Sequence, residues 1–346
     1  MQRIKIKAST NYEVVIGKDL LKKVGPEILK VVPCCKVLIV SDDRVAPKYM
    51  STVLDSMSAV GYDVSTYVLK HGEKSKNSEN YLKLLNHLAE LGFTRRDLLV
   101  ALGGGVVGDL TGFVASTFMR GIKYVQVPTT LLAGIDSSVG GKTAIDLKSG
   151  KNLVGTFYQP AKVIFDVKTL ETLPEKEYLN GLGEAVKYAI MDGGEIYELV
   201  KDGLSHDELE RFCTLCVKSK KQVVEKDEKE GGYRQILNLG HTIAHAIEKM
   251  SGYTIPHGRC VAMGIKAIAD VSLKNGWLDV ESSVLIEKML RNNGLMTPPP
   301  YKVEDMIDVI KSDKKMKGDT ITIVVINKIG RCDFVDIKID RLKKYL

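Results

Sequence analysis

The segment Leu98–Asp146 decides the fold, and it reads LLVALGGGVVGDLTGFVASTFMRGIKYVQVPTTLLAGIDSSVGGKTAID. It opens with a short apolar run, as expected of a strand that is buried on both faces of a parallel sheet. The run leads into glycines at 103, 105 and 108, which have the G-x-G-x-x-G spacing and precede an apolar helical pattern. Glycine there permits a sharp turn and a close approach to a pyrophosphate, which helix N-terminal N–H groups bind. The segment therefore predicts a strand, a phosphate-binding turn and a helix.

The residues upstream repeat the alternation of strands and helices. Lys36–Ser41 and Asp63–Leu69 have the composition of strands, and a helical pattern separates them. This series predicts a doubly wound parallel sheet with a ligand outside the carboxyl ends of its strands. The glycine spacing alone also occurs in turns that bind nothing. Thr129 and Thr130, moreover, stand about twenty residues beyond it, where an acidic residue is usual. We expect a dinucleotide that is held differently from the common case.

The second half of the chain has a different pattern. Its length of 346 residues suits two domains. We predict an α/β nucleotide-binding domain over residues 1–174 and a mostly α-helical domain that binds metal and substrate over residues 175–346. The helical period covers about Glu177–Val200, Asp207–Lys226, Arg234–Met250, Val261–Asn275 and Glu281–Asn293, and Thr320–Ile326 reads as one strand of a terminal hairpin closed around residues 327–330.

Composition excludes several classes of function. The aromatic share of 6% and the absence of a basic tract argue against a nucleic-acid partner, and no apolar run is long enough for a membrane span. The net charge of +7 is equally consistent with a mixed surface and with a basic pocket for an anion. Six cysteines without a framework spacing suit a reducing cytoplasm. We interpret Cys213 and Cys216 as packing residues rather than a redox or zinc pair.

Three segments of the helical half carry groups that could bind a metal. Glu184 and Lys187 are three residues apart on one helix face, His241 and His245 are four apart on another, and His257 follows a proline. One carboxylate and two imidazoles with an open coordination position suit a zinc ion. The residue after His241 is threonine and not the glutamate of a metalloprotease, which disfavours that class. A single histidine of this kind is commonly an interior hydrogen-bonding residue, but the combination favours a metal.

Motifs along essentially the whole chain resemble 3-dehydroquinate synthase, a sugar-phosphate cyclase family of the shikimate pathway. They occur in the family's order: HGEKSK, GGGVVGDLTGFVAS, FMRG, VPTTLLAGIDSSVGGKTAID, GKN, LETLPE, GLGEAVKY, EGGYRQILNLGHTIAHAIE, HGRCVAMG and SDKKMKG. The resemblance implies an NAD- and metal-dependent carbon–oxygen lyase of aromatic amino acid and chorismate biosynthesis. Its substrate would be 3-deoxy-D-arabino-heptulosonate 7-phosphate and its products 3-dehydroquinate and phosphate. The implied steps are transient oxidation by NAD, phosphate elimination, re-reduction, ring opening and aldol closure.

The resemblance also implies residue roles. A zinc or cobalt ion would be held by Glu184, His241 and His257. Arg120 would reach the phosphate site of a neighbouring subunit, which implies a homodimer. Substrate would lie among Asp136, Lys142, Asn152, Lys187, Lys220, Arg234, Asn238, His245, Lys314 and Lys315. NAD would contact Asp42, His71, Gly72, Glu73, Lys74, Ser75, Lys76, Gly105, Val106, Val107, Gly108, Asp109, Thr129, Thr130, Lys142, Lys151, Thr169, Leu170, Glu171 and Thr172.

Three positions depart from the family's pattern: Ala244 in place of glycine, Gly183 in place of alanine, and Arg259 in place of glutamate. We expect Ala244 to displace its helix slightly and Arg259 to add positive charge near the metal.

Three alternatives stay open. Another sugar-phosphate cyclase is disfavoured by Lys220, Asn238 and His245 together. A metal-dependent polyol or alcohol dehydrogenase is disfavoured by the glutamate ligand and the many phosphate-binding cations. A catalytically silent NAD-binding protein would be expected to have lost a metal ligand, and none of the three is missing.

Overall fold

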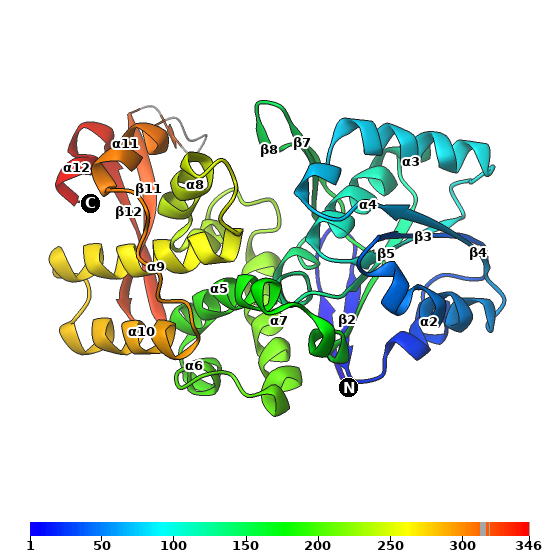
Figure 1. Ribbon diagram of the computed structural model, residues 1–346, viewed down its shortest axis with the longest axis horizontal. Coiled ribbons are helices and arrows are strands. Elements are labelled where there is room, and N and C mark those ends of the chain that lie inside the picture. The colour runs from blue at the N-terminus through cyan, green and yellow to red at the C-terminus, as the bar shows by residue number, and fades with distance from the viewer. Residues whose placement is uncertain (312–315, 318, 346) are drawn as a thin grey trace. The chain divides into compact units, whose positions relative to one another are not determined.

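The computed structural model of the chain describes residues 1–311, 316–317 and 319–345 (Figure 1). The chain separates into two compact units. The first comprises Met1–Leu173 and Lys220–Lys229, and the second comprises Pro174–Ser219 and Glu230–Leu346. The segment Lys220–Lys229 thus packs with the first unit, whereas the division expected from the sequence assigned it to the second.

A seven-stranded sheet forms the centre of the first unit, with the strand order β1-β2-β9-β6-β5-β3-β4. Within it only β1 and β2 pair antiparallel, so β2, β9, β6, β5, β3 and β4 form a parallel sheet. The order reverses between β3 and β5, because β4 adds on one side of β3 and β5 on the other. The doubly wound parallel sheet predicted from the sequence is confirmed. The strands are β1 (Gln2–Ile6), β2 (Tyr12–Gly17), β3 (Lys36–Asp42), β4 (Asp63–Leu69), β5 (Leu98–Gly103), β6 (Lys123–Pro128) and β9 (Lys162–Asp166).

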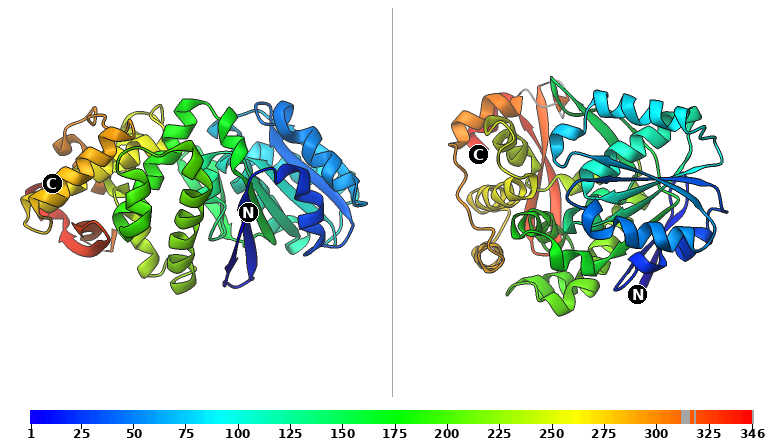
Figure 2. Two further views of the ribbon diagram at one scale, coloured as in Figure 1. Left: turned by 90° about the horizontal axis from the view of Figure 1, so that it is seen from below. Right: turned by 45° about the vertical axis from the view of Figure 1, so that its right-hand side comes forward.

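Both faces of this sheet are covered by helices, which explains the continuous apolar strands. Val37 and Ile39 of β3 point into a core shared with α1 and α2, while Leu38 and Val40 point into a core shared with α3 and α4. Figures 1 and 2 show α2 and α3 on the two sides of the sheet. The helices are α1 (Val24–Leu29), α2 (Ala46–Ser58), α3 (Ser78–Glu90) and α4 (Gly105–Thr117).

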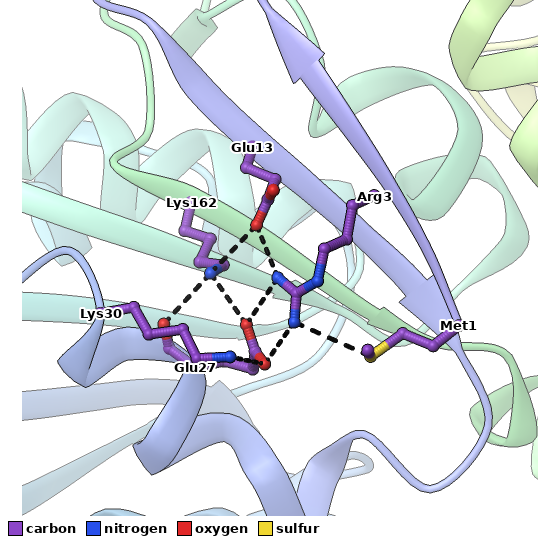
Figure 3. Close-up of polar contacts among 6 residues, drawn as sticks. All are labelled: Met1, Arg3, Glu13, Glu27, Lys30 and Lys162. Carbon is purple, nitrogen blue, oxygen red and sulfur yellow. Dashed lines mark hydrogen bonds and ion pairs between the residues drawn. The ribbon is translucent and has the colours of Figure 1, made fainter.

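An ion network fixes the N-terminal hairpin to this sheet (Figure 3). Glu27 of α1 accepts hydrogen bonds from Arg3 of β1 at 2.6 and 3.0 Å, from Lys30 at 2.6 Å and from Lys162 of β9 at 2.9 Å. Glu13 of β2 pairs with Arg3 at 2.7 Å and with Lys162 at 3.3 Å. Three segments that are distant in sequence, β1, α1 and β9, therefore meet at the Glu27 carboxylate, and the sequence patterns did not indicate this contact.

The second unit consists mostly of helices around α9. This helix packs against α5, α8, α10 and β11. A three-stranded antiparallel sheet with the order β10-β11-β12 completes the unit. The elements are α5 (Glu175–Asp192), α6 (Gly194–Val200), α7 (Leu209–Lys226), α8 (His241–Met250), α9 (His257–Lys274), α10 (Val280–Asn292), α11 (Val303–Lys311), β10 (Met316–Lys317), β11 (Thr320–Lys328), β12 (Arg331–Lys338) and α12 (Leu342–Tyr345). The part of α7 from Lys220 onward belongs to the first unit.

Two of the predicted helices are interrupted by glycine. The helix expected over Glu177–Val200 is broken at Gly193, which has a φ of 61°. This residue ends α5 and precedes a second helix, α6. The helix expected over Arg234–Met250 is a 3₁₀ turn followed, after Gly240 at φ 77°, by α8. Periodicity alone does not reveal these breaks, because an apolar stripe can continue across a left-handed glycine. None of the helices in the described part of the chain is long and apolar enough to cross a membrane.

Candidate active site

Three side chains that could hold a metal ion meet in the second unit. Glu184 lies on α5, His241 is the first residue of α8, and His257 is the first residue of α9. Their ligand atoms all lie within 4.8 Å of one another. Glu184 Oε1 is 3.0 Å from His257 Nε2 and 3.2 Å from His241 Nε2. One carboxylate oxygen and two imidazole nitrogens that converge in this way fit a divalent metal with an open coordination position.

Hydrogen bonds on the far side of each ring orient the two imidazoles. His241 Nδ1 lies 3.1 Å from the carbonyl oxygen of Leu239, and His257 Nδ1 lies 3.1 Å from Glu248 Oε2. A proton on each Nδ1 leaves Nε2 as the nitrogen that faces Glu184 and could ligate a metal. Sequence reasoning missed Glu248, although a spacing of seven residues from His241 indicates the same helix face.

Charge within the cluster shifts the pKa values of its groups. Burial opposes the ionisation of Glu184, but Lys187 Nζ at 2.5 Å and the two imidazoles outweigh burial and hold the pKa of this carboxyl well below its ordinary value. Burial lowers the pKa of His241 to about 4, although Glu184 opposes the shift. Burial acts in the same direction on His257, but hydrogen bonds to Glu184 and Glu248 raise its pKa to about 10. The site therefore presents an ionised carboxylate and a neutral His241.

Close helix packing brings the ligands of α5 and α9 together. A Cβ on Gly183 would lie 1.9 Å from the carbonyl oxygen of Gly258, and a Cβ on Gly258 would lie 1.8 Å from that of Asn180. Such contacts with backbone atoms cannot be relieved by side-chain rotation. Gly183 and Gly258 immediately neighbour Glu184 and His257 in sequence, so this approach sets the separation of two ligands.

The other two departures from the family's pattern have simple structural roles. Ala244 is fully buried on α8. The opposing residue on α9 is Gly264, whose added Cβ would lie 2.1 Å from the Gly240 carbonyl oxygen and 3.2 Å from the nitrogen of Ala244. Arg259 donates to the carbonyl oxygen of Gly294, just beyond α10, at 2.6 Å. Its guanidinium is therefore engaged at a helix end, so the structure gives no support to the charge that we expected it to add at the metal.

Further substrate candidates lie in the same unit. The ring centroid of His245 is 5.5 Å from that of His241 and 6.2 Å from that of His257. Arg234 is fully buried in the 3₁₀ turn Tyr233–Asn238, at whose end Asn238 lies. Lys314 and Lys315 lie outside the described residues.

In the first unit, the turn between β5 and α4 forms a narrow cradle. Gly104 caps α4 without a side-chain hydrogen bond. A Cβ on Gly105 would lie 3.1 Å from Ser137 Oγ, and one on Gly104 would lie 3.1 Å from Thr130 Cγ2. The hydroxyls of Ser137 and Thr129 are buried with no hydrogen-bond partner among the described residues. Free helix N–H groups, tight space and unpaired hydroxyls fit a bound pyrophosphate; sequence reasoning missed Ser137.

Lys76 organises a charged cluster beside this turn. Its Nζ lies 2.9 Å from Glu73, 3.2 Å from Asp109, 2.7 Å from Asn152 and 3.8 Å from Asp146. Burial disfavours the ammonium, but the carboxylates raise the pKa of Lys76 above its ordinary value. Burial also raises the pKa of Asp109 to about 6 despite the Lys76 charge. Three acids thus share one buried cation.

Most of the predicted NAD contacts lie at one edge of the sheet, because the carboxyl ends of parallel strands share an edge. Asp42 ends β3 and accepts hydrogen bonds from the backbone N–H groups of Arg44 and Val45 at 2.9 and 3.0 Å. The hairpin of β7 (Lys142–Leu147) and β8 (Gly150–Phe157) carries Lys142 and Lys151. The other predicted NAD contacts follow four strands of the sheet. After β4 come His71, Gly72, Glu73, Lys74, Ser75 and Lys76, and after β5 come Gly105, Val106, Val107, Gly108 and Asp109. After β6 come Thr129 and Thr130, and after β9 come Thr169, Leu170, Glu171 and Thr172.

Two substrate candidates of the first unit form an ion pair. Lys220 Nζ donates to the carbonyl oxygen of Asp136 at 2.7 Å and to the Asp136 carboxylate. Asn152 has a φ of 55° and Arg120 a φ of 66°, the left-handed region that few non-glycine residues adopt. Arg120 is exposed at the end of the 3₁₀ turn Phe118–Arg120. In this unit the structure therefore pairs Asp136 with Lys220 and places Asn152 against Lys76.

Family models match most of the chain. The model of the 3-dehydroquinate synthase N-terminal region matches residues 66–180, and the model of the C-terminal region matches residues 181–316. The chain is 41% identical to the 3-dehydroquinate synthase of Streptococcus thermophilus over 97% of this chain and 96% of that protein. It is 39% identical to that of Clostridium acetobutylicum, again over 97% and 96% of the two chains.

Solved structures of related enzymes have the same fold. A 2-deoxy-scyllo-inosose synthase complexed with carbaglucose-6-phosphate, NAD⁺ and Co²⁺ is 25% identical, with a TM-score of 0.90 over 99% of this chain and 98% of that chain. The 2-epi-5-epi-valiolone synthase of Streptomyces hygroscopicus is 22% identical, with a TM-score of 0.87 over the same shares. An iron-containing alcohol dehydrogenase aligns less well, at a TM-score of 0.65 and 16% identity over 88% of this chain and 91% of that chain. From the two family models and the near full-length relatives, the chain belongs to the 3-dehydroquinate synthase family.

Proposed function

We propose that the chain converts 3-deoxy-D-arabino-heptulosonate 7-phosphate to 3-dehydroquinate and phosphate, as an NAD- and metal-dependent carbon–oxygen lyase. The observation that carries the proposal is the convergence of Glu184, His241 and His257, with Lys187 bound to the same carboxylate. This arrangement, in a chain of the 3-dehydroquinate synthase family, supplies both a metal site and a cation for an anionic substrate.

The cofactors would be NAD and one divalent ion, zinc or cobalt, since this ligand set suits both metals. When bound, NAD supplies a reversible hydride acceptor and the metal polarises the hydroxyl that is oxidised. Glu184, His241 and His257 would hold the ion. The N-terminus of α4, with the unpaired hydroxyls of Ser137 and Thr129, would hold the NAD pyrophosphate.

The remaining polar residues would bind and orient the substrate. A carboxylate and a phosphate at its two ends call for cations, and Lys187, Lys220 and Arg234 are buried cations. His245, beside the imidazole ligands, would relay protons or bind phosphate. Because the substrate's own phosphate can accept the proton lost on elimination, the protein needs little further acid–base machinery. We include in the substrate site, by resemblance, Asp136, Lys142, Asn152, Asn238, Lys314 and Lys315.

Phosphate release tests this proposal. Purified, metal-loaded protein is given the heptulosonate phosphate with a trace of NAD, while absorbance is followed for NADH. Phosphate in large excess over NAD without accumulation of NADH is the expected result. Stoichiometric NADH without phosphate would instead identify a dehydrogenase. Inertness toward this substrate, with turnover of another sugar phosphate, would identify a different cyclase.

We further propose a homodimer in which Arg120 reaches the partner's phosphate site. Two features support it: the exposed, left-handed Arg120 and the hairpin of β7 and β8, on which Leu147, Val154 and Phe157 are exposed. Exposed apolar strand edges are typical of contact surfaces. Mixing R120A and K187M chains tests it, since shared sites would restore part of the activity that each variant lacks. Activity that stays absent in proven mixed dimers would contradict it.

The cytoplasmic location indicated by the cysteine content also stays a proposal. All six cysteines are free thiols in the structure, and Cys213 and Cys216 are fully buried on α7. Their burial supports a packing role for this pair. Thiol titration of protein purified without reductant would test the assignment.

A further inference from the structure

We propose that Glu248 is a positioning residue of the metal centre, whose carboxylate holds the His257 imidazole so that Nε2 faces the ion. The inference rests on the proposed function, because it concerns the metal that function requires. Glu248 is not among the three side chains whose ligand atoms converge. Its effect on the metal therefore passes through His257.

The geometry assigns different tasks to the two ring nitrogens of His257. Nδ1 lies 3.1 Å from Glu248 Oε2, and Nε2 lies 3.0 Å from Glu184 Oε1. An ionised carboxylate accepts hydrogen bonds and donates none, so the Nδ1 partner requires a proton on that nitrogen. Nε2 is then the nitrogen that faces Glu184, and it would ligate a metal after giving up its proton. Glu248 thus selects the tautomer and the ring orientation that ligation needs.

The location of Glu248 is costly unless a positive group compensates it. Its side chain is only 5% exposed, and burying an unpaired carboxylate is strongly unfavourable. It also lies in the last turn of α8, which ends at Met250, where the helix dipole disfavours a negative charge. A surface glutamate would avoid both costs. The hydrogen bond from His257 Nδ1 at 3.1 Å contributes to offsetting both costs.

The second imidazole ligand is held in a different manner. His241 Nδ1 faces the backbone carbonyl of Leu239, a neutral acceptor that no side-chain exchange removes. His257 depends on a charged side chain instead, and a carboxylate partner makes an imidazole a stronger metal donor than a carbonyl does. α8 therefore supplies one ligand, His241, and orients another through Glu248. The two α8 residues are seven apart and share a helix face.

Metal affinity tests the inference without reference to catalysis. Wild-type protein, E248A, E248Q and the control E281Q, an exposed glutamate of α10, are each titrated with Zn²⁺ against a chromophoric chelator. We expect E248A to weaken binding by about 10–100-fold. E248Q should weaken it by less, since its amide oxygen still accepts from Nδ1–H, and E281Q should match wild type. The Co²⁺ absorption bands of E248A should shift relative to wild type, because the ligand field at His257 changes.

Three outcomes overturn the inference. Zinc affinity of E248A within twofold of wild type would show that His257 needs no such partner. A role in folding alone would be shown by three results together. E248Q and E248A would lose zinc affinity equally, their Co²⁺ spectra would not shift, and the melting temperatures of the two metal-free proteins would drop equally. Wild-type protein that binds no ion would overturn the metal centre of the proposed function itself. If E248A does not fold, the comparison of E248Q with E281Q decides.

Discussion

Exchange of Glu27 for glutamine would test the ion network of the first unit in a quantitative way (Figure 3). Glu27 accepts from Arg3, Lys30 and Lys162, so the exchange removes the one charge that all three cations share. Lys162 is 1% exposed and would keep the more distant Glu13, at 3.3 Å, as its carboxylate partner.

The expected loss is large because the remaining charge is buried. Removal of one partner of a buried ion pair costs about 3–5 kcal/mol. For a unit of about 180 residues, each kcal/mol lowers the melting temperature by about 2–4 °C. We therefore expect E27Q to lower the melting temperature by about 6–20 °C. The matched variant K162M leaves Glu27 paired with Arg3 and Lys30, so it should cost less than E27Q does.

Calorimetry at several pH values completes the test. Burial opposes ionisation of Glu27, but hydrogen bonds from Arg3, Lys30 and Lys162 hold its pKa well below the ordinary value of 4.5. Its ionised form therefore stabilises the fold above about pH 4.5, and this contribution is lost as the pH falls toward the lowered pKa. The stability difference between wild type and E27Q should accordingly shrink as the pH falls from 6 to 3. Equal losses for E27Q and K162M, or a deficit that is independent of pH, would refute the reasoning.

Three further predictions concern the site. His241→Ala should weaken zinc affinity by more than about 100-fold, more than loss of an outer hydrogen-bond partner does, and chelator competition that finds wild-type affinity would contradict the assigned ligand. Asp109→Asn should become more stable relative to wild type as the pH rises from 4 to 7. Burial raises the pKa of Asp109 from 3.8 to about 6, so its ionisation costs more in the folded protein than in the unfolded chain and weakens the wild-type fold over this range. Melting temperatures of the two proteins that change in parallel from pH 4 to pH 7 would contradict the prediction. Gly258→Ala should destabilise by several kcal/mol, since its Cβ would lie 1.8 Å from the Asn180 carbonyl oxygen; the exposed control Lys176→Ala should stay within about 0.5 kcal/mol, and equal thermal stability of the two variants would be evidence against the close packing.

Local patterns predicted the core of the first unit well. The strands at Lys36, Asp63 and Leu98 begin at the residues that the apolar runs indicated, and the glycine turn follows Leu102 as expected. Such runs are informative because a strand buried on both faces leaves no room for polar residues. The hairpin of β1 and β2 and the strand β9 were not predicted, since their place in the sheet depends on pairing with distant residues.

The residues of the candidate site also fall into those that local patterns predicted and those that they missed. Glu184, the pair His241 and His245, and His257 together predicted a metal centre, because residue type and helix period are local properties. Glu248 and Ser137 were missed, since each gains a role only from a neighbour that the fold supplies. The expected charge of Arg259 at the metal is likewise unsupported, because its guanidinium reaches the carbonyl oxygen of Gly294 instead.

By itself, the sequence determined the class of fold and the family, and it predicted most of the candidate metal and phosphate ligands. These follow from periodicity, residue chemistry and the order of motifs, which no distant contact alters. Only the tertiary structure decided where helices break at Gly193 and Gly240, which unit Lys220 joins, and which carboxylate holds His257. These depend on burial and on contacts between residues far apart in the chain, whose energies a local pattern does not contain.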